Sequence, residues 1–160
     1  SAVGTRAMFT PFKGGNPITT DFKGNNYESV LCYESLFALY MAKKSTKRIG
    51  AFIVHANEHW LKDQAGSEQY LYENVAIAVQ GGKPLLRSSN SGVSAVINQK
   101  GDILSPIIGR VDKNLTSKVS LNYTTTLYSK ISGIFYAGGG ISSFLILFLS
   151  IIKKSSKTIS

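Results

Sequence analysis

Cysteine is scarce in this sequence: Cys32 is the only one among 160 residues. A lone thiol cannot form an intramolecular disulfide, so a fold held together by disulfides is excluded, and the cysteine count does not assign a compartment. A single unpaired thiol is instead either a small buried apolar side chain or a reactive group.

Acidic residues are also few, nine against 18 basic ones, and the formal net charge is +9. Lys153, Lys154 and Lys157 carry three of these charges near the C-terminus, and the other basic residues are scattered along the chain. No basic helix with interleaved aromatic residues is present, and we therefore expect no nucleic-acid partner. The positive charge favours either attraction to anionic lipid head groups or plain solvation.

The N-terminus lacks the apolar stretch of a secretory signal, because residues 1–6 read SAVGTR. The long apolar run lies at the other end, where residues 131–152 form a stretch of 22 residues without a charge. This length predicts one transmembrane helix, followed by a basic cytoplasmic tail at residues 153–160. The alternative is a buried core helix of a water-soluble protein, which Gly138, Gly139 and Gly140 would destabilise because glycine has a low helix propensity.

This orientation places residues 1–130 outside the cytoplasm, and an upstream segment must then export them. We therefore expect the chain to be the back part of a longer protein. Apolar periodicity and turn residues predict an α/β domain with two helices and several strands. The predicted strands are residues 27–31, 50–55, 84–88, 92–97, 102–104 and 117–121, and the predicted helices are residues 34–44 and 66–80.

Cys32 stands where a predicted strand passes into a predicted helix. At such a junction, backbone N–H groups and the positive end of the helix dipole stabilise a thiolate, which is the nucleophilic form of the side chain. The other interpretation of Cys32, a buried structural thiol, remains open at this point.

The motif His55-Ala56-Asn57-Glu58-His59 matches the H-x-x-E-H pattern of one zinc metalloprotease class. Two such histidines share a metal only on a helix. Here the first closes an apolar, strand-like run, and four residues of extended chain span about 13 Å. We therefore predict a loop at the C-terminal edge of a sheet, with no metal site and no cofactor.

Four motifs occur together in one order. They are Leu31-Cys32-Tyr33-Glu34, then Asn57-Glu58-His59-Trp60, then Gly66 with Gln69-Tyr70, and last the run GKPLLRSSNSGVSAVI at residues 82–97. Over about residues 27–152 this order resembles the C-terminal part of bacterial apolipoprotein N-acyltransferases. These enzymes carry a nitrilase-like, or carbon–nitrogen hydrolase, domain between membrane helices.

The resemblance implies part of a nitrilase-like αββα sandwich over residues 1–130, tethered by the transmembrane helix to the bacterial inner membrane and facing the periplasm. It implies acyl transfer from a phospholipid, through a cysteine thioester, to the α-amine of the diacylglyceryl-cysteine at an apolipoprotein's N-terminus. By motif position, Cys32 resembles the nucleophile and Glu34 a catalytic group that orients its neighbours. Tyr33 and Trp60 resemble substrate-binding residues, and Arg87, Ser89 and Asn90 resemble structural support.

The sequence departs from the family in one important respect. The family's acid/base Glu, its Lys and a further Glu precede the cysteine, and only 31 residues precede Cys32 here. We therefore expect the upstream half of the same enzyme to supply them as a partner. Two other hypotheses remain: a non-catalytic membrane-anchored remnant or split half, and a membrane-anchored nitrilase-type amidase that uses water in place of the amine.

Overall fold

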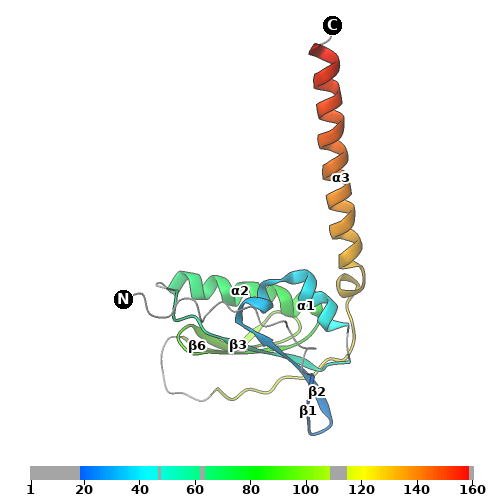
Figure 1. The fold of residues 1–160 in the computed structure, drawn as a ribbon. Coiled ribbons are helices and arrows are strands. Elements are labelled where there is room, and N and C mark those ends of the chain that lie inside the picture. The colour runs from blue at the N-terminus through cyan, green and yellow to red at the C-terminus, as the bar shows by residue number, and fades with distance from the viewer. Residues whose placement is uncertain (1–18, 47, 62–63, 109–114, 159–160) are drawn as a thin grey trace, which may run out of the picture.

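The computed structural model describes residues 19–46, 48–61, 64–108 and 115–158 (Figure 1). Within them, a six-stranded sheet carries two helices on one face, and a long third helix rises from that same side. The elements are β1 (Thr19–Phe22), β2 (Asn25–Leu31), the short 3₁₀ helix η2 (Cys32–Leu36), α1 (Ala38–Ser45), β3 (Ala51–Ala56), α2 (Gln64–Gly81), β4 (Leu85–Ser89), β5 (Val93–Ile97), β6 (Ile103–Ile108) and α3 (Leu127–Thr158).

The strands follow one another across the sheet in chain order, β1 to β6. β2, β3 and β4 run parallel, with Leu31 opposite His55 and Ala56 opposite Ser89, and the outer strands are antiparallel. Parallel strands bring their carboxyl ends to one edge of the sheet, where α/β proteins bind ligands. Cys32, Asn57 and Asn90 follow these three strand ends directly, so the topology gathers them at that edge.

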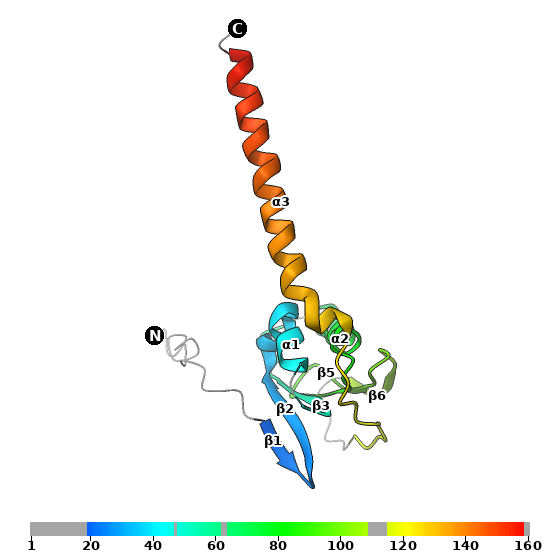
Figure 2. The same ribbon diagram turned by 90° about the vertical axis from the view of Figure 1, so that its right-hand side faces the viewer.

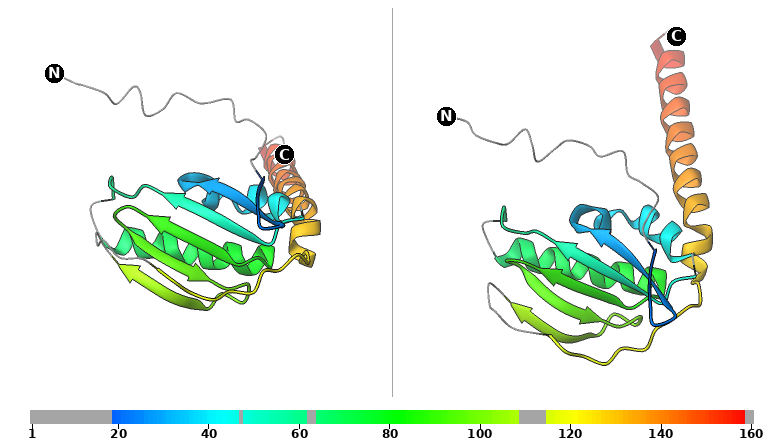
Figure 3. Two further views of the ribbon diagram at one scale, coloured as in Figure 1. Left: turned by 90° about the horizontal axis from the view of Figure 1, so that it is seen from below. Right: turned by 60° about the horizontal axis from the view of Figure 1, so that its bottom comes forward.

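The hydrophobic core lies between the sheet and the two short helices. Alternate strand residues point into it, and α1 and α2 contribute Met41, Leu71 and Ile77. The strand residues are Val30, Phe52, Val54, Leu85, Val93, Ala95 and Ile97. The opposite face carries half-buried Ile53 and Leu86. Figure 3 views the molecule from below and shows no helix of the described residues over this face.

α3 is the predicted apolar helix. Its stretch Leu127–Ile152 is long and apolar enough to cross a membrane, and apart from Ser129 and Ser132 in its first two turns its side chains are largely exposed. The helix starts four residues before the predicted span and projects well beyond the rest of the molecule (Figure 2). The predicted α/β class with one such C-terminal helix is confirmed.

The base of α3 is docked on the helical layer. Ser129 Oγ lies 2.7 Å from Ser45 Oγ at the end of α1, and both side chains are buried. The preceding segment is tied down by the buried ammonium of Lys83, which donates to the carbonyl oxygens of Asn122 at 2.8 Å and Thr124 at 2.9 Å. The direction in which α3 leaves the domain is therefore set by buried polar contacts.

Several local expectations are wrong. The Gly, Asn, Pro and Thr content of residues 1–26 predicts a loop, but residues 19–22 form strand β1 and residues 25–26 begin β2. Residues 117–121 are irregular instead of a strand. The helix expected over residues 34–44 is two elements, because Phe37 has an extended ψ of 91°. The apolar spacing of the second predicted helix indicates an inner stripe of Leu71, Val75, Ala78 and Val79, but Val79 is 46% exposed and the buried positions of α2 include Asn74. The loop expected over residues 1–18 lies outside the described residues.

Candidate active site

Cys32 occupies a sharp turn between β2 and η2. Its φ is +30°, a left-handed conformation that non-glycine residues adopt rarely and that stores strain. A nucleophile held on a strained strand-to-helix turn is also the arrangement that exposes the reactive serine of α/β-hydrolases. The thiol is half-buried, with Sγ 3.8 Å from the carbonyl oxygen of Asn57. Strand β2 thus presents Cys32 at the edge of the sheet where the three parallel strands end.

Glu34 fastens this turn. Its Oε2 accepts a hydrogen bond from the backbone N–H of Leu31 at 3.0 Å, and its Oε1 accepts one from the Tyr40 hydroxyl at 3.3 Å. On the buried side, Ser35 Oγ donates to the carbonyl oxygen of Cys32 at 2.7 Å. The geometry therefore gives Glu34 a place in shaping the backbone on either side of the thiol, and its predicted catalytic role stays a prediction.

Three aromatic side chains cluster beside Cys32. The Tyr33 and Trp60 rings stack at a centroid distance of 6.0 Å, and Tyr70 of α2 meets them edge-on at 6.2 Å and 6.1 Å. Trp60 Nε1 donates at 3.0 Å to the carbonyl of Asn57, the same oxygen that lies near the Cys32 sulfur. The structure thus brings together Tyr33 and Trp60, the two residues predicted to bind substrate.

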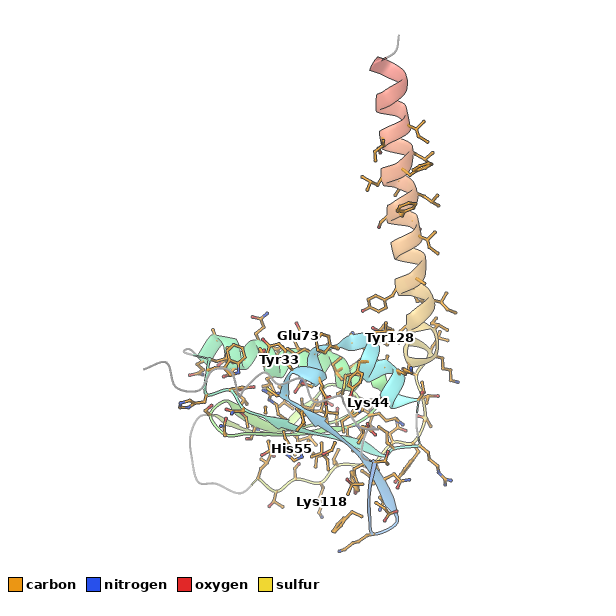
Figure 4. All side chains as sticks on the ribbon, in the orientation of Figure 1. Tyr33, Lys44, His55, Glu73, Lys118 and Tyr128 are labelled. Atoms are coloured by element: carbon orange, nitrogen blue, oxygen red, sulfur yellow. The ribbon has the colours of Figure 1, made fainter. Side chains whose placement is uncertain are left out.

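Tyr70 is not among the site residues predicted from the sequence, although the motif Gln69-Tyr70 is one of the four that carry the family resemblance. Burial is the larger reason that the pKa of its hydroxyl is raised, and a hydrogen bond with Tyr33 adds to it. In Figure 4, Tyr33 lies on the helical side of the sheet, the side from which α3 also rises. The aromatic cluster Tyr33–Trp60–Tyr70 therefore lies beside the thiol.

A buried polar network supports the turn from below. The Arg87 guanidinium donates through Nε to the carbonyl of Val93 at 3.0 Å and through Nη1 to Asn74 Oδ1 at 2.7 Å, and it pairs with the Glu58 carboxylate. Asn74 Nδ2 in turn donates to Ser35 Oγ at 3.1 Å. Burial lowers the pKa of Arg87 to about 10, and the nearby Cys32 works in the opposite direction. An uninterrupted chain of polar contacts thus joins Glu58 to the backbone of Cys32.

Glu58 belongs to the H-x-x-E-H motif, and the structure separates its parts. His55 lies in β3 and is exposed on the uncovered face (Figure 4), whereas the Glu58 carboxylate is buried against Arg87. It packs so closely on Gly92 that a Cβ there would overlap it. Within the described residues, no group of three or more His, Cys, Asp or Glu is placed to hold a metal ion.

This fold has known counterparts among carbon–nitrogen hydrolases. The chain superposes on an amidase from Nesterenkonia sp. AN1 with a TM-score of 0.52 and 17% identity, covering 66% of this chain and 43% of the amidase. A carbon–nitrogen hydrolase from Helicobacter pylori G27 gives a TM-score of 0.51 and 14% identity, covering 59% and 39%. The domain therefore has part of the nitrilase-like fold.

The sequence is similar to apolipoprotein N-acyltransferases. It is 26% identical to that of Pasteurella multocida over 120 residues (74% of this chain, 23% of the relative) and 29% identical to that of Rhizobium meliloti over 130 residues (78% and 24%). With that of Brucella suis the identity is 31% over 98 residues (59% and 18%). No family model matches the chain.

The predicted resemblance is thus confirmed, and it supports an enzyme family of the acyltransferase kind. The chain spans about a quarter of the length of the curated relatives it matches.

Proposed function

We propose that this chain is the nucleophile-bearing part of a membrane-bound N-acyltransferase that acylates lipoproteins. The observation that carries the proposal is the strained turn at the end of β2, which presents Cys32 beside the aromatic cluster Tyr33–Trp60–Tyr70. The similarity to apolipoprotein N-acyltransferases supports the substrate class. In this proposal Cys32 is the nucleophile and Glu34 its positioning group, while Tyr33 and Trp60 contact the substrates.

The reaction splits one transfer into two steps. The Cys32 thiolate attacks the acyl carbonyl of a phospholipid, an S–C bond forms, and the ester C–O bond breaks, so that a lysophospholipid alkoxide leaves and takes a proton. The α-amine of a diacylglyceryl-cysteine then attacks the thioester, an N–C bond forms, and the S–C bond breaks. The proton lost by the amine returns the sulfur to its resting state.

This scheme needs a base for the thiol proton and a cation at the oxyanion. We propose that a carboxylate and a lysine of the upstream half of the enzyme supply them. That half would cover the open face of the sheet, where Ile53 and Leu86 are half-buried and no helix of the described residues lies. Residues 1–130 would then be one part of a complete αββα sandwich.

The proposed location is the bacterial inner membrane. α3 would cross it, with residues 1–130 on the periplasmic side and the basic tail 153–160 in the cytoplasm, in line with the positive-inside rule. The 26-residue apolar stretch Leu127–Ile152 supports the crossing.

Trapping the thioester tests the proposal. The complete gene product that contains this chain is incubated with a phospholipid carrying a radiolabelled acyl chain, quenched in acid and digested. We expect label on the Cys32 peptide that neutral hydroxylamine removes, and no hydroxylamine-labile label with Cys32→Ser. A synthetic diacylglyceryl-cysteine peptide should then discharge the adduct with the acyl group on its amine.

Two outcomes would contradict the proposal. If no adduct forms on the complete protein, the enzymatic role fails and the non-catalytic alternative gains support. If the adduct forms but passes to water in the presence of the lipopeptide, the reaction is that of a hydrolase.

A further inference from the structure

Large apolar side chains are exposed along the segment that follows Cys32. Phe37, between η2 and α1, is 60% exposed, and Leu39 and Tyr40 in the first turn of α1 are 44% and 38% exposed. Together with Glu34 and Lys43 they line a shallow groove on η2 and α1. A soluble surface seldom leaves such a contiguous apolar patch open, and patches of this kind mark contacts with proteins or membranes. We call this surface, formed by Glu34, Phe37, Leu39, Tyr40 and Lys43, the η2–α1 face.

The η2–α1 face lies next to the point where α3 becomes apolar. Helix α1 ends at Ser45, whose hydroxyl is 2.7 Å from that of Ser129 in the first turn of α3. The membrane-length stretch of α3 begins at Leu127, in the same turn. Figures 1 and 2 both show α1 on the side of the sheet from which α3 rises. Because the buried serine contact joins the end of α1 to the first turn of α3, α1 would lie at the surface of a bilayer that α3 crosses.

We propose that the η2–α1 face is a second membrane contact, in which Phe37 and Leu39 enter the interfacial layer of the same bilayer that α3 crosses. This inference rests on the membrane crossing in the proposed function. Amphipathic helices bind in this way, with apolar side chains in the acyl boundary and basic ones at the head groups. Lys43 supplies the cation at the rim of the groove. The contact would hold the Cys32 turn, five residues before Phe37, at the depth of the phospholipid ester bonds.

The chemistry of the face favours lipid over a protein partner. Its one acidic group, Glu34, already accepts hydrogen bonds from Leu31 N–H and the Tyr40 hydroxyl, so no carboxylate points outward without a partner. Helix α1 is joined through Ser45 and Ser129 to a helix that has the length and composition to enter the bilayer.

Spin-label depth measurements test this inference on the full chain. Cys32 is the sole cysteine, so Cys32→Ser gives a background in which one new cysteine at a time carries a nitroxide. The test positions are Phe37→Cys and Leu39→Cys. The matched control is Phe22→Cys, because Phe22 is also 60% exposed and belongs to β1, and the β1–β2 hairpin extends away from α3 (Figure 1). Ile141→Cys reports the bilayer interior.

The protein is reconstituted into vesicles of phosphatidylethanolamine and phosphatidylglycerol. At each site, collision rates with apolar oxygen and with a water-soluble nickel chelate are compared. We expect the oxygen-to-nickel ratio at residues 37 and 39 to be several-fold above that at residue 22 and below that at residue 141. The background carries no thiol, so the result does not depend on acyl transfer.

A ratio at residues 37 and 39 equal to that at residue 22, with residue 141 inside the bilayer, overturns the η2–α1 contact and leaves the crossing by α3 intact. A water-like ratio at residue 141 overturns both. Protection of residues 37 and 39 from both reagents, in detergent as well as in vesicles, would show that protein covers the face and would also overturn the proposal.

Discussion

Arg87 and Glu58 form an ion pair in which neither side chain reaches solvent. Arg87 comes from the centre of β4 and Glu58 from the loop after β3, so the pair joins that loop to the neighbouring strand. A buried pair of this kind is weak support for stability in itself, but the loss of one partner strands an uncompensated charge. The Asn74 and Ser35 side chains connect this pair to the backbone of Cys32.

Substitution Arg87→Met should therefore destabilise the domain strongly. It leaves the Glu58 carboxylate buried without its cation, and breaking such a pair costs about 3–5 kcal/mol. We expect this loss in the free energy of unfolding, measured by denaturant titration of the full chain in detergent micelles. The double variant Arg87→Met/Glu58→Leu should recover much of it, because neither charge then remains. Arg48→Met removes the same charge from an exposed site and should change stability by less than about 0.5 kcal/mol. A loss from Arg87→Met no larger than that from Arg48→Met would contradict the pairing.

Much of the layout around this pair follows from local patterns. Apolar runs predicted the strands that end before Cys32 and Asn57, and the charge-free stretch predicted α3, because buried strands and membrane-length helices both need apolar residues in a recognisable pattern. No such pattern in the sequence marks the Arg87 network. Asn74 sits on the inner stripe of α2 between apolar residues, and only the packing of α2 on β4 brings it to the Arg87 guanidinium. Likewise, nothing local marks the break at Phe37, where the turn held by Glu34 ends.

The strain at Cys32 should be measurable as a reversal of the usual alanine–glycine order. A residue with a Cβ in the left-handed region costs about 1–2 kcal/mol, and glycine avoids this cost. We therefore expect the free energy of unfolding of Cys32→Gly to exceed that of Cys32→Ala by about 1 kcal/mol. At exposed Ala76, in the middle of α2, Ala76→Gly should instead cost about 1 kcal/mol. The same sign at both positions would show that the turn is relaxed.

The Lys44–Glu28 ion pair between α1 and β2 should make stability depend on alkaline pH. Burial disfavours the Lys44 ammonium, but Glu28 and Tyr40 together outweigh it and raise its pKa above the ordinary value of 10.5. A raised pKa stabilises the folded state fully below pH 10.5 and progressively less as the pH rises through the folded value. The unfolding free energy of the wild type minus that of Lys44→Met/Glu28→Gln should thus be constant from neutral pH to about pH 9. At higher pH this difference should fall, because the wild type loses stability relative to the variant. Its persistence unchanged above pH 11 would contradict the raised pKa.

Lys83 should decide how firmly α3 is attached to the sheet. Its ammonium is wholly buried, which lowers its pKa, and it holds the carbonyls of Asn122 and Thr124 just before α3. Lys83→Met keeps the length of the side chain but removes both hydrogen bonds, and unsatisfied buried groups cost about 1–3 kcal/mol each. We expect amide hydrogen exchange of residues 122–129 to speed up markedly in the full chain in nanodiscs, while the amides of β3 and β4 stay protected. Lys118→Met removes an exposed charge from the same connecting segment and should leave the exchange unchanged. Equal exchange in the two variants would mean that the contact between Ser45 and Ser129 is sufficient to hold α3 in place.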